Sequence, residues 1–374
     1  MPQTWLIVGA TRGIGLEFTT QLLSLGHTVI ATARPPTHSL LTPSPSLPLP
    51  LPLSHPNSNS PNSPHTPKFP SNASNLWALT GTPNGHNLTI LECDVSSEES
   101  IKNFTESVRK LGRKGGVLEN GVVDAVVLNA GVLEYPGRVC EISFPSFAHH
   151  LHTNTVGPLI TASRLLSLSS PLPSPSSPSN PSAQPTTPLS PLQPATPIHI
   201  NTLVFISSDS GSTTNFRSFE DGFGAYAASK AALNQGLRHL AAAIHRNAKP
   251  TPNSGTDLNP NSNPRENGTG KTVVLALHPG EVSTDMANVA LDWEVEGIIS
   301  PQESISCMLK VIEEKGFGGK DEGGVVSAGE QGRRQEEGAA TFWTWEGERG
   351  GGGGEYEMMN CRWKMRFWSI CICM

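Results

Sequence analysis

A chain of 374 residues with a formal net charge of −6, and with basic residues scattered along it, gives no indication of a nucleic-acid-binding surface. Its six cysteines have neither the spacing of a disulfide framework nor that of metal ligands, so we expect no metal site and a reducing, cytoplasmic location. We also expect no secretory signal and no transmembrane segment, because no apolar run is long enough.

The chain opens with an apolar segment, a glycine-rich turn and a helical pattern. Residues 4–8 predict a buried strand, and the residues after Gly15 predict a helix. Between them the glycines are spaced G-x-x-x-G-x-G, which differs from the commoner G-x-G-x-x-G. Such a turn lets the backbone approach a pyrophosphate at the helix N-terminus, where free N–H groups and the helix dipole favour negative charge. The candidate cofactor residues here are Gly9, Thr11, Arg12, Gly13, Ile14 and Gly15.

A second strand, predicted over residues 28–33, ends at Arg34. In a doubly wound sheet this end meets the adenosine ribose, where an acidic residue would bind the free 2′-hydroxyl of NAD. A guanidinium suits a 2′-phosphate instead, so Arg34 predicts NADP (NADPH) and makes NAD the less favoured cofactor. The alternative is that Arg12 and Arg34 are ordinary arginines in solvent.

Three segments rich in Pro, Ser and Asn interrupt the predicted elements. Residues 35–85, 169–197 and 249–270 carry prolines or polar runs that oppose packing, and we expect disordered insertions there. Each falls between predicted elements, where insertions are tolerated. Without them, residues 1–347 predict a single doubly wound α/β domain of the Rossmann type, with a central parallel sheet and helices on both faces.

Two further strands end in polar residues that we assign to the cofactor. Residues 88–95 form a predicted strand whose end, Asp94 and Val95, would reach the adenine ring. Residues 122–129 are almost continuously apolar, which is typical of a central parallel strand. The turn that follows it contains Asn129, Ala130 and Gly131.

The next predicted helix, from Phe144 to about Leu168, carries Asn154 among apolar positions. Asparagine is disfavoured in the middle of a helix unless its side chain is used. Asn154 is therefore either a functional residue or a buried asparagine satisfied by its neighbours.

A serine, a tyrosine and a lysine follow a strand predicted over residues 203–208. Tyr226 and Lys230 are four residues apart, so on a helix they share one face. A neighbouring ammonium favours the phenolate and lowers the pKa of the phenol, which makes Tyr226 a candidate general acid or base. Ser208, at the strand end, can hold a carbonyl oxygen; Ser207 should point to the opposite face. The alternative is that Tyr226 packs, Lys230 extends to solvent and Ser208 caps a loop.

A last buried strand over residues 272–278 is followed by a proline–glycine turn. Taken in chain order, the motifs resemble the short-chain dehydrogenase/reductase (SDR) family of classical type. The residues that carry this resemblance are the glycine turn, Asp94, Asn129, Gly131, Asn154, Ser208, Tyr226, Lys230, Pro279, Gly280 and Thr284. Within the family, residues 278–286 and 300–304 are similar to the carbonyl reductases of the sniffer and C-factor type.

The resemblance implies an NADP-dependent enzyme that reduces a small aldehyde or ketone, or oxidises the corresponding alcohol. Tyr226 would exchange the proton, Ser208 would share the grip on the oxygen, and Lys230 would hold the ribose. Asn154 would support a water that links Lys230 to solvent, and a basic Arg12 again implies NADP. The resemblance further assigns to the cofactor Asn129, Ala130, Gly131, Tyr226, Lys230, Pro279, Gly280, Val282 and Thr284.

Two expectations remain open at this stage. An aromatic residue is common in the subgroup where Glu281 stands, so the polarity of the substrate site is undecided. The family often forms homodimers or homotetramers through the helices equivalent to those with Asn154 and Lys230. A non-catalytic NADP-binding scaffold or sensor is the competing hypothesis, although all four catalytic residues are present.

The end of the chain departs from the family pattern. Residues 341–347 predict a last edge strand, whereas residues 348–374 form a tail rich in Gly, Trp, Met and Cys. Three interpretations of the tail are open: an incorrect gene model, a divergent appendage, or a prenylation signal at Cys371 with basic residues upstream.

Overall fold

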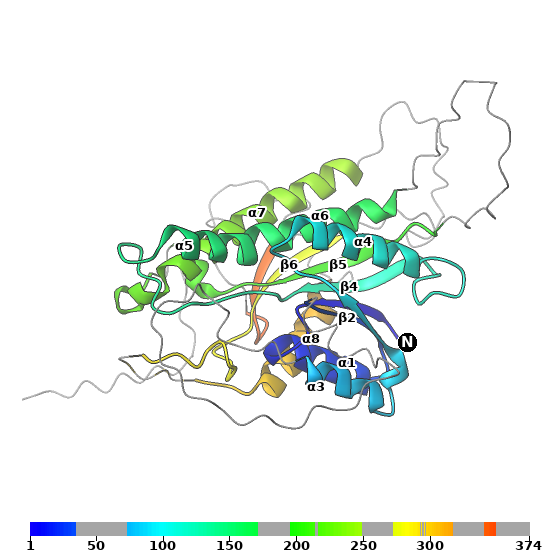
Figure 1. Cartoon of the computed structure of the whole chain (residues 1–374), viewed down its shortest axis with the longest axis horizontal. Helices are drawn as coiled ribbons and strands as arrows, with labels where there is room; N and C mark the ends of the chain where they lie inside the picture. The colour runs from blue at the N-terminus through cyan, green and yellow to red at the C-terminus, as the bar shows by residue number, and fades with distance from the viewer. Residues whose placement is uncertain are drawn as a thin grey trace, which may run out of the picture.

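The computed structural model describes residues 1–34, 73–170, 195–213, 216–248, 272–291, 293, 295, 297–316 and 340–348. These residues form a seven-stranded sheet in the order β3-β2-β1-β4-β5-β6-β7, and every pairing is parallel. Helices α4, α5, α6 and α7 cover one face, and α1, α3 and α8 cover the other (Figure 1). The predicted doubly wound α/β fold is therefore confirmed.

The strands are short and mostly apolar, as expected where helices cover both faces. Their bounds are β1 Thr4–Val8, β2 Thr28–Ala33, β3 Leu88–Glu92, β4 Val122–Leu128, β5 His199–Ile206, β6 Val273–His278 and β7 Thr341–Thr344.

The helices alternate with the strands along the chain. Their bounds are α1 Gly13–Ser24, α3 Ser74–Ala78, α4 Glu98–Leu111, α5 Phe144–Leu151, α6 Gly157–Leu166, α7 Gly224–Ala248 and α8 Pro301–Gly316. A single π-helical turn, η3 (His152–Val156), joins α5 to α6. Short 3₁₀ turns are η1 Leu79–Gly81, η2 Gly85–Asn87, η4 Ser167–Ser169, η5 Asp209–Gly211 and η6 Ser218–Phe223.

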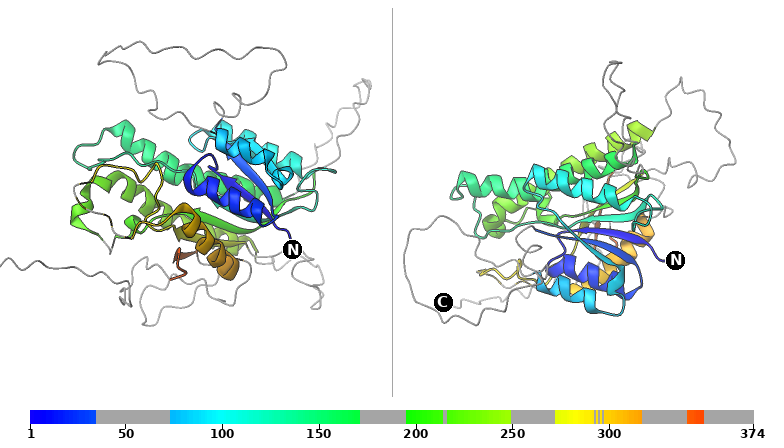
Figure 2. Two further views of the ribbon diagram at one scale, coloured as in Figure 1. Left: turned by 90° about the horizontal axis from the view of Figure 1, so that it is seen from below. Right: turned by 45° about the vertical axis from the view of Figure 1, so that its right-hand side comes forward.

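The sheet separates two hydrophobic cores. Because side chains alternate across a strand, Leu6 and Val8 of β1 enter the core beneath α4, α6 and α7. Trp5 and Ile7 enter the core on the other face, where α1 lies between α3 and α8 (Figure 2, left). The two cores hold the strand ends, and with them the loops at the carboxyl edge, in fixed relative positions.

The first predicted insertion extends too far. Residues 73–85 were expected to be disordered, but they form α3 and η1, and Leu76 is fully buried in the core beside α1. Asn84 also anchors this segment, because its amide donates to the carbonyl of Leu23 at 2.8 Å. The apolar Leu76 and Trp77 supply the buried surface that the proline-rich residues before them lack. Residues 169–170 and 195–197, at the ends of the second predicted insertion, are also placed.

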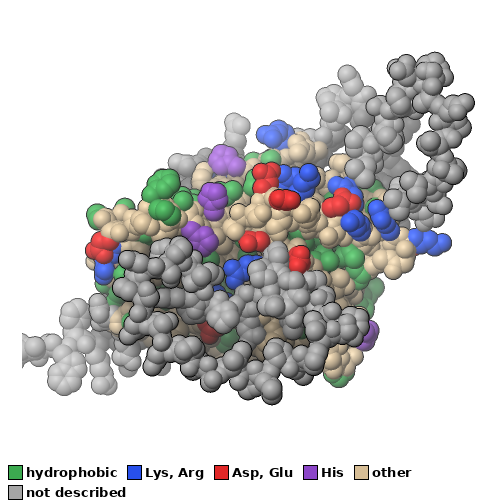
Figure 3. All heavy atoms as spheres, in the orientation of Figure 1, with side chains coloured by type: hydrophobic (Ala, Val, Ile, Leu, Met, Phe, Trp, Pro, Cys, Tyr) green, Lys and Arg blue, Asp and Glu red, His purple; other side chains and the backbone are tan. Residues whose placement is uncertain are grey.

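The remaining parts of the three predicted insertions lie outside the described residues, as does the tail with Cys371. Among the helices that are described, none combines the length and hydropathy needed to cross a membrane. On the outer face, acidic and basic side chains are intermixed over α4 and α6 (Figure 3), where Arg164 pairs with Glu98 at 2.6 Å.

Candidate active site

The glycine turn between β1 and α1 is packed against the turn that follows β4. Gly9 has a φ of +88°, and a Cβ there would lie 2.7 Å from the backbone of Ala130. A Cβ at Gly15 would overlap the carbonyl oxygen of Gly9 and lie 2.6 Å from Nδ2 of Asn129. That amide donates to the Gly9 carbonyl at 2.8 Å. Only glycine fits these positions, so the start of α1 presents bare backbone at the carboxyl edge of the sheet.

The segment after β6 meets the same turn. A Cβ at Gly13 would lie 3.3 Å from the methyl group of Thr284, and Val282 forms a bridge with Ile299. The carbonyl of Pro279 accepts a hydrogen bond of 2.6 Å from Ser304. The residues of this segment that the resemblance assigns to the cofactor, namely Pro279, Gly280, Val282 and Thr284, therefore lie on one segment that runs towards the glycine turn.

The residues predicted for the adenosine end come from neighbouring strand ends. Arg12 and Arg34 are exposed and follow β1 and β2, which pair in the sheet. Asp94 follows β3, and its carboxylate accepts from the backbone N–H and the hydroxyl of Ser96, at 2.9 and 2.6 Å. Val95 is buried against Gly157 of α6. The side chain of Asp94 thus shapes the turn before α4.

Ser208, Tyr226 and Lys230 are brought together where β5 ends and α7 begins. The hydroxyls of Ser208 and Tyr226 are joined by a hydrogen bond, and the Lys230 ammonium lies 5.5 Å from the centre of the Tyr226 ring. Lys230 Nζ donates to the carbonyl of Ile206 at 2.8 Å. Ser207, in contrast, points away and donates to Asn234 at 2.6 Å. The choice of Ser208 over its neighbour agrees with this geometry.

The pKa of Tyr226 does not move in the predicted direction. Burial raises it well above the usual value of 10, the hydrogen bond with Ser208 acts against this rise, and the charges of Glu281 and Asp209 add to it. Burial also lowers the pKa of Lys230 to about 8. The expected lowering of the Tyr226 pKa by Lys230 is wrong for this arrangement, because the amine is held at a backbone carbonyl and over the ring.

Asn154 is fully buried in the π-helical turn η3, and its amide is paired at both ends. Its Oδ1 accepts from the N–H of Val132 at 2.8 Å, and its Nδ2 donates to the Val132 carbonyl and to Ser229 Oγ, both at 2.9 Å. Of the two alternatives for this side chain, the satisfied buried asparagine describes what is seen. Asn154 fastens the loop after β4 to α7, which carries Tyr226.

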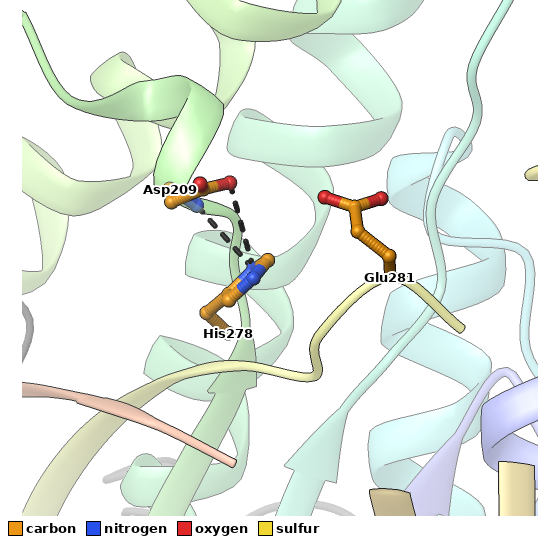
Figure 4. A group of neighbouring side chains, drawn as sticks. All are labelled: Asp209, His278 and Glu281. Atoms are coloured by element: carbon orange, nitrogen blue, oxygen red, sulfur yellow. Dashed lines mark hydrogen bonds and ion pairs between the residues drawn. The ribbon is translucent and has the colours of Figure 1, made fainter. Parts of the chain in front are cut away.

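A group of charged residues beside Ser208 was missed from the sequence. Arg217 forms ion pairs with Asp209 at 3.1 Å and with Glu220 at 2.9 Å, and His278 Nδ1 lies 3.7 Å from Asp209. Figure 4 shows Asp209, which follows β5, facing His278 and Glu281 at the end of β6 and the turn after it. The potential ligand atoms of the three residues lie within 4.8 Å of one another. Such a set could hold a metal ion, although no metal site was expected.

Burial opposes ionisation of Asp209, yet His278 and Arg217 hold its pKa below the ordinary value. These residues come from two separate segments of the chain, residues 209–220 and residues 278–281, so no local motif could reveal them. The adjacency of Asp209 to Ser208, and of His278 and Glu281 to the proline–glycine turn, was the available signal.

An aromatic cluster is formed mainly by the same two segments of the chain. Trp293 contacts Phe219 and Phe223 edge-on, with ring centres 5.5 and 6.3 Å apart, and Phe223 lies 4.9 Å from Tyr135. Phe216, Phe219 and Phe223 all belong to the segment between Ser208 and the start of α7. Phe219 and Phe223 join the cluster, whereas Phe216 is 75% exposed.

Comparison with known proteins agrees with this architecture. No family model matches the chain. It is 27% identical over 318 residues to an uncharacterized oxidoreductase of Saccharomyces cerevisiae, covering 83% of this chain and 89% of that protein. It is 24% identical over 323 residues to an uncharacterized oxidoreductase of Schizosaccharomyces pombe, covering 83% and 90%.

The solved structures that share the fold include several carbonyl reductases. The NADPH-bound carbonyl reductase from chicken fatty liver has a TM-score of 0.56 and 22% identity, covering 94% of this chain and 99% of that one. The carbonyl reductase Sniffer of D. melanogaster has a TM-score of 0.55 and 17% identity, covering 94% and 100%. An NADP-bound putative short-chain dehydrogenase/reductase from Burkholderia multivorans has a TM-score of 0.54 and 18% identity, covering 94% and 100%.

The fold is therefore that of the short-chain dehydrogenases/reductases, as the sequence motifs predicted. This chain is similar in structure to carbonyl reductases, including Sniffer.

Proposed function

We propose that the protein is an NADP-dependent oxidoreductase of the SDR type, which reduces the carbonyl group of an aldehyde or ketone or oxidises the corresponding alcohol. The observation that carries this proposal is the hydrogen-bonded pair Ser208 and Tyr226, with Lys230 over the tyrosine ring, at the same carboxyl edge of the sheet as the glycine turn. The relatives named as oxidoreductases and the similar carbonyl reductases support it.

The residues present fit a dinucleotide. The bare backbone at Gly9, Gly13 and Gly15 suits a pyrophosphate, because a side chain at any of them would meet neighbouring atoms. Arg12 and Arg34 suit the 2′-phosphate of NADP, and the similar structures from chicken and Burkholderia multivorans are described as NADPH- or NADP-bound. The segment from Pro279 to Thr284 would border the nicotinamide end.

The bound cofactor supplies the hydride, and the protein supplies position and a proton. Ser208 would donate a hydrogen bond to the carbonyl oxygen, while Tyr226 would transfer its phenolic proton to the same oxygen as the hydride reaches the carbon. A buried phenol with a raised pKa stays protonated at neutral pH, which suits the direction of reduction. The phenolate would then recover a proton from solvent, a step for which the sequence resemblance assigns Lys230 and Asn154.

The test is NADPH oxidation by the purified protein against a panel of aldehydes, ketones and quinones, with NADH assayed in parallel. Tyr226→Phe should lose turnover by at least about a hundredfold, the typical contribution of a general acid. Its affinity for NADPH and its melting temperature should stay close to the wild-type values.

Substantial turnover by Tyr226→Phe would refute the role assigned to the phenol. Saturable NADPH binding without oxidation by any carbonyl compound would instead favour a scaffold or sensor that does not catalyse a reaction.

A further inference from the structure

Three carboxylates lie close together beside Arg217 and His278. Asp209 follows Ser208, Glu220 lies in η6 just before α7, and Glu281 follows the proline–glycine turn after β6. Potential ligand atoms of Asp209 and Glu281 lie within 4.8 Å of each other (Figure 4). The Glu281 charge acts on both neighbouring groups, because it contributes to the raised pKa of Tyr226 and to that of Glu220.

The nearby cations compensate these carboxylates only in part. Arg217 is shared between Asp209 and Glu220, and His278 lies against Asp209. The Lys230 ammonium is committed to the carbonyl of Ile206. Among the described residues, the exposed carboxylate of Glu281 has no ion-pair partner. Its negative charge is therefore the one left for a ligand.

Aromatic rings occupy the same two segments of the chain as these carboxylates. Phe223 lies three positions before Tyr226, and Trp293 lies beyond Glu281 on the segment that follows β6. Trp293 is in edge contact with Phe219 and with Phe223. Aromatic faces combined with a carboxylate are the surroundings that proteins use to bind organic ammonium groups, because the ring quadrupole and the carboxylate both attract a cation.

Resting on the function proposed above, we propose that Glu281, together with the rings of Phe219, Phe223 and Trp293 on the same two segments, makes the enzyme select carbonyl substrates that carry an organic ammonium group. The carbonyl would lie at Ser208 and Tyr226, and the cationic nitrogen would lie at Glu281. Substrates that carry a carboxylate near the carbonyl would be repelled by Glu281 and Asp209. An aromatic residue at position 281 could contact neutral and cationic substrates alike, whereas a glutamate there favours a cationic substrate over a neutral one.

The experiment compares three aldehydes of similar shape: 4-(trimethylammonio)benzaldehyde, neutral 4-tert-butylbenzaldehyde and anionic 4-formylbenzoate. NADPH-dependent kcat/KM is measured for the wild type, for Glu281→Gln and for a control, Glu99→Gln. Glu99 is an exposed glutamate in the first turn of α4. The assays contain EDTA, so a metal ion held by Asp209, His278 and Glu281 cannot produce the preference. Because the ratio of cationic to neutral aldehyde is compared between variants, the intrinsic reactivity of each aldehyde cancels.

We expect Glu281→Gln to lower that ratio about three- to tenfold, the range for one partly solvated ion pair with aromatic support. The ratio for Glu99→Gln should equal that of the wild type, and added salt should lower the wild-type ratio. If the enzyme reduces the neutral aldehyde, but the ratio of kcat/KM for the cationic aldehyde to that for the neutral one is the same in the wild type and in Glu281→Gln, the role assigned to Glu281 is wrong. The proposed function would then still stand. NADPH binding without reduction of any of the three aldehydes would overturn both.

Discussion

Replacing Asn154 by alanine tests whether this residue holds the active site together. The change removes three hydrogen bonds of 2.8–2.9 Å, two to the backbone of Val132 and one to Ser229. The N–H and carbonyl of Val132 would lose these partners, and each such hydrogen bond contributes about 0.5–1.5 kcal/mol to stability. The free energy of unfolding should therefore fall by about 2–4 kcal/mol. At about 2–4 °C per kcal/mol, the melting temperature should fall by about 4–16 °C.

The assay is urea unfolding monitored by circular dichroism, together with kcat for any carbonyl substrate found in the panel. Asn103→Ala is the matched control, because Asn103 is exposed on α4 and its replacement should change stability by less than about 0.5 kcal/mol. If Asn154→Ala unfolds within about 0.5 kcal/mol of the wild type, the reasoning that Asn154 fastens the loop after β4 to α7 is wrong. A loss of kcat without a loss of stability would instead assign Asn154 to the proton relay alone.

Two further predictions concern Ser208, which follows β5, and Lys230 on α7. Ser208→Ala should lower kcat/KM by at least about tenfold, because a hydrogen bond to the charge that develops on the carbonyl oxygen is lost. Ser207→Ala, the control, should retain turnover. Equal losses of kcat/KM in both variants would contradict the choice of Ser208. Burial lowers the pKa of Lys230 from 10.5 to about 8, so between these values the unfolded chain binds more protons than the folded one. Its contribution to the free energy of unfolding should therefore rise as the pH increases from about 8 to about 10.5, and Lys230→Met should lack this rise in pH-dependent urea unfolding.

The sheet was predictable because its signals are local. Apolar runs bounded by turns predicted the strands at residues 4–8, 28–33 and 122–129, and these lie within one residue of β1, β2 and β4. The predicted boundary of the first insertion at residue 85 was wrong, because α3 is a helix of five residues and is too short to show a periodic pattern. Its position depends on the burial of Leu76 against α1, which is a tertiary contact.

The candidate site also has features that the sequence could predict and features that it could not. The glycine turn and the pair Tyr226 and Lys230 have fixed spacing in the chain, so pattern alone placed them together. The direction of the Tyr226 pKa could not be predicted, because it depends on burial and on the charges of Asp209 and Glu281, which reach the tyrosine from two other segments. Helical spacing fixes only that two side chains share a face, and here that face places the Lys230 amine over the ring.

The charge at position 281 links substrate choice to the acidity of the catalytic phenol. Glu281 and Asp209 both add to the raised pKa of Tyr226, after burial itself. A positive charge bound at Glu281 acts in the opposite direction, because it favours the phenolate that forms when the proton is transferred. If Glu281 binds the ammonium group of the substrate, two effects follow. The attraction to Glu281 tightens substrate binding in the ground state, and the easier deprotonation of Tyr226 lowers the free energy of the transition state. Only the second effect raises kcat, so a cationic substrate that improves KM alone would show that Glu281 binds the nitrogen without influencing the proton transfer.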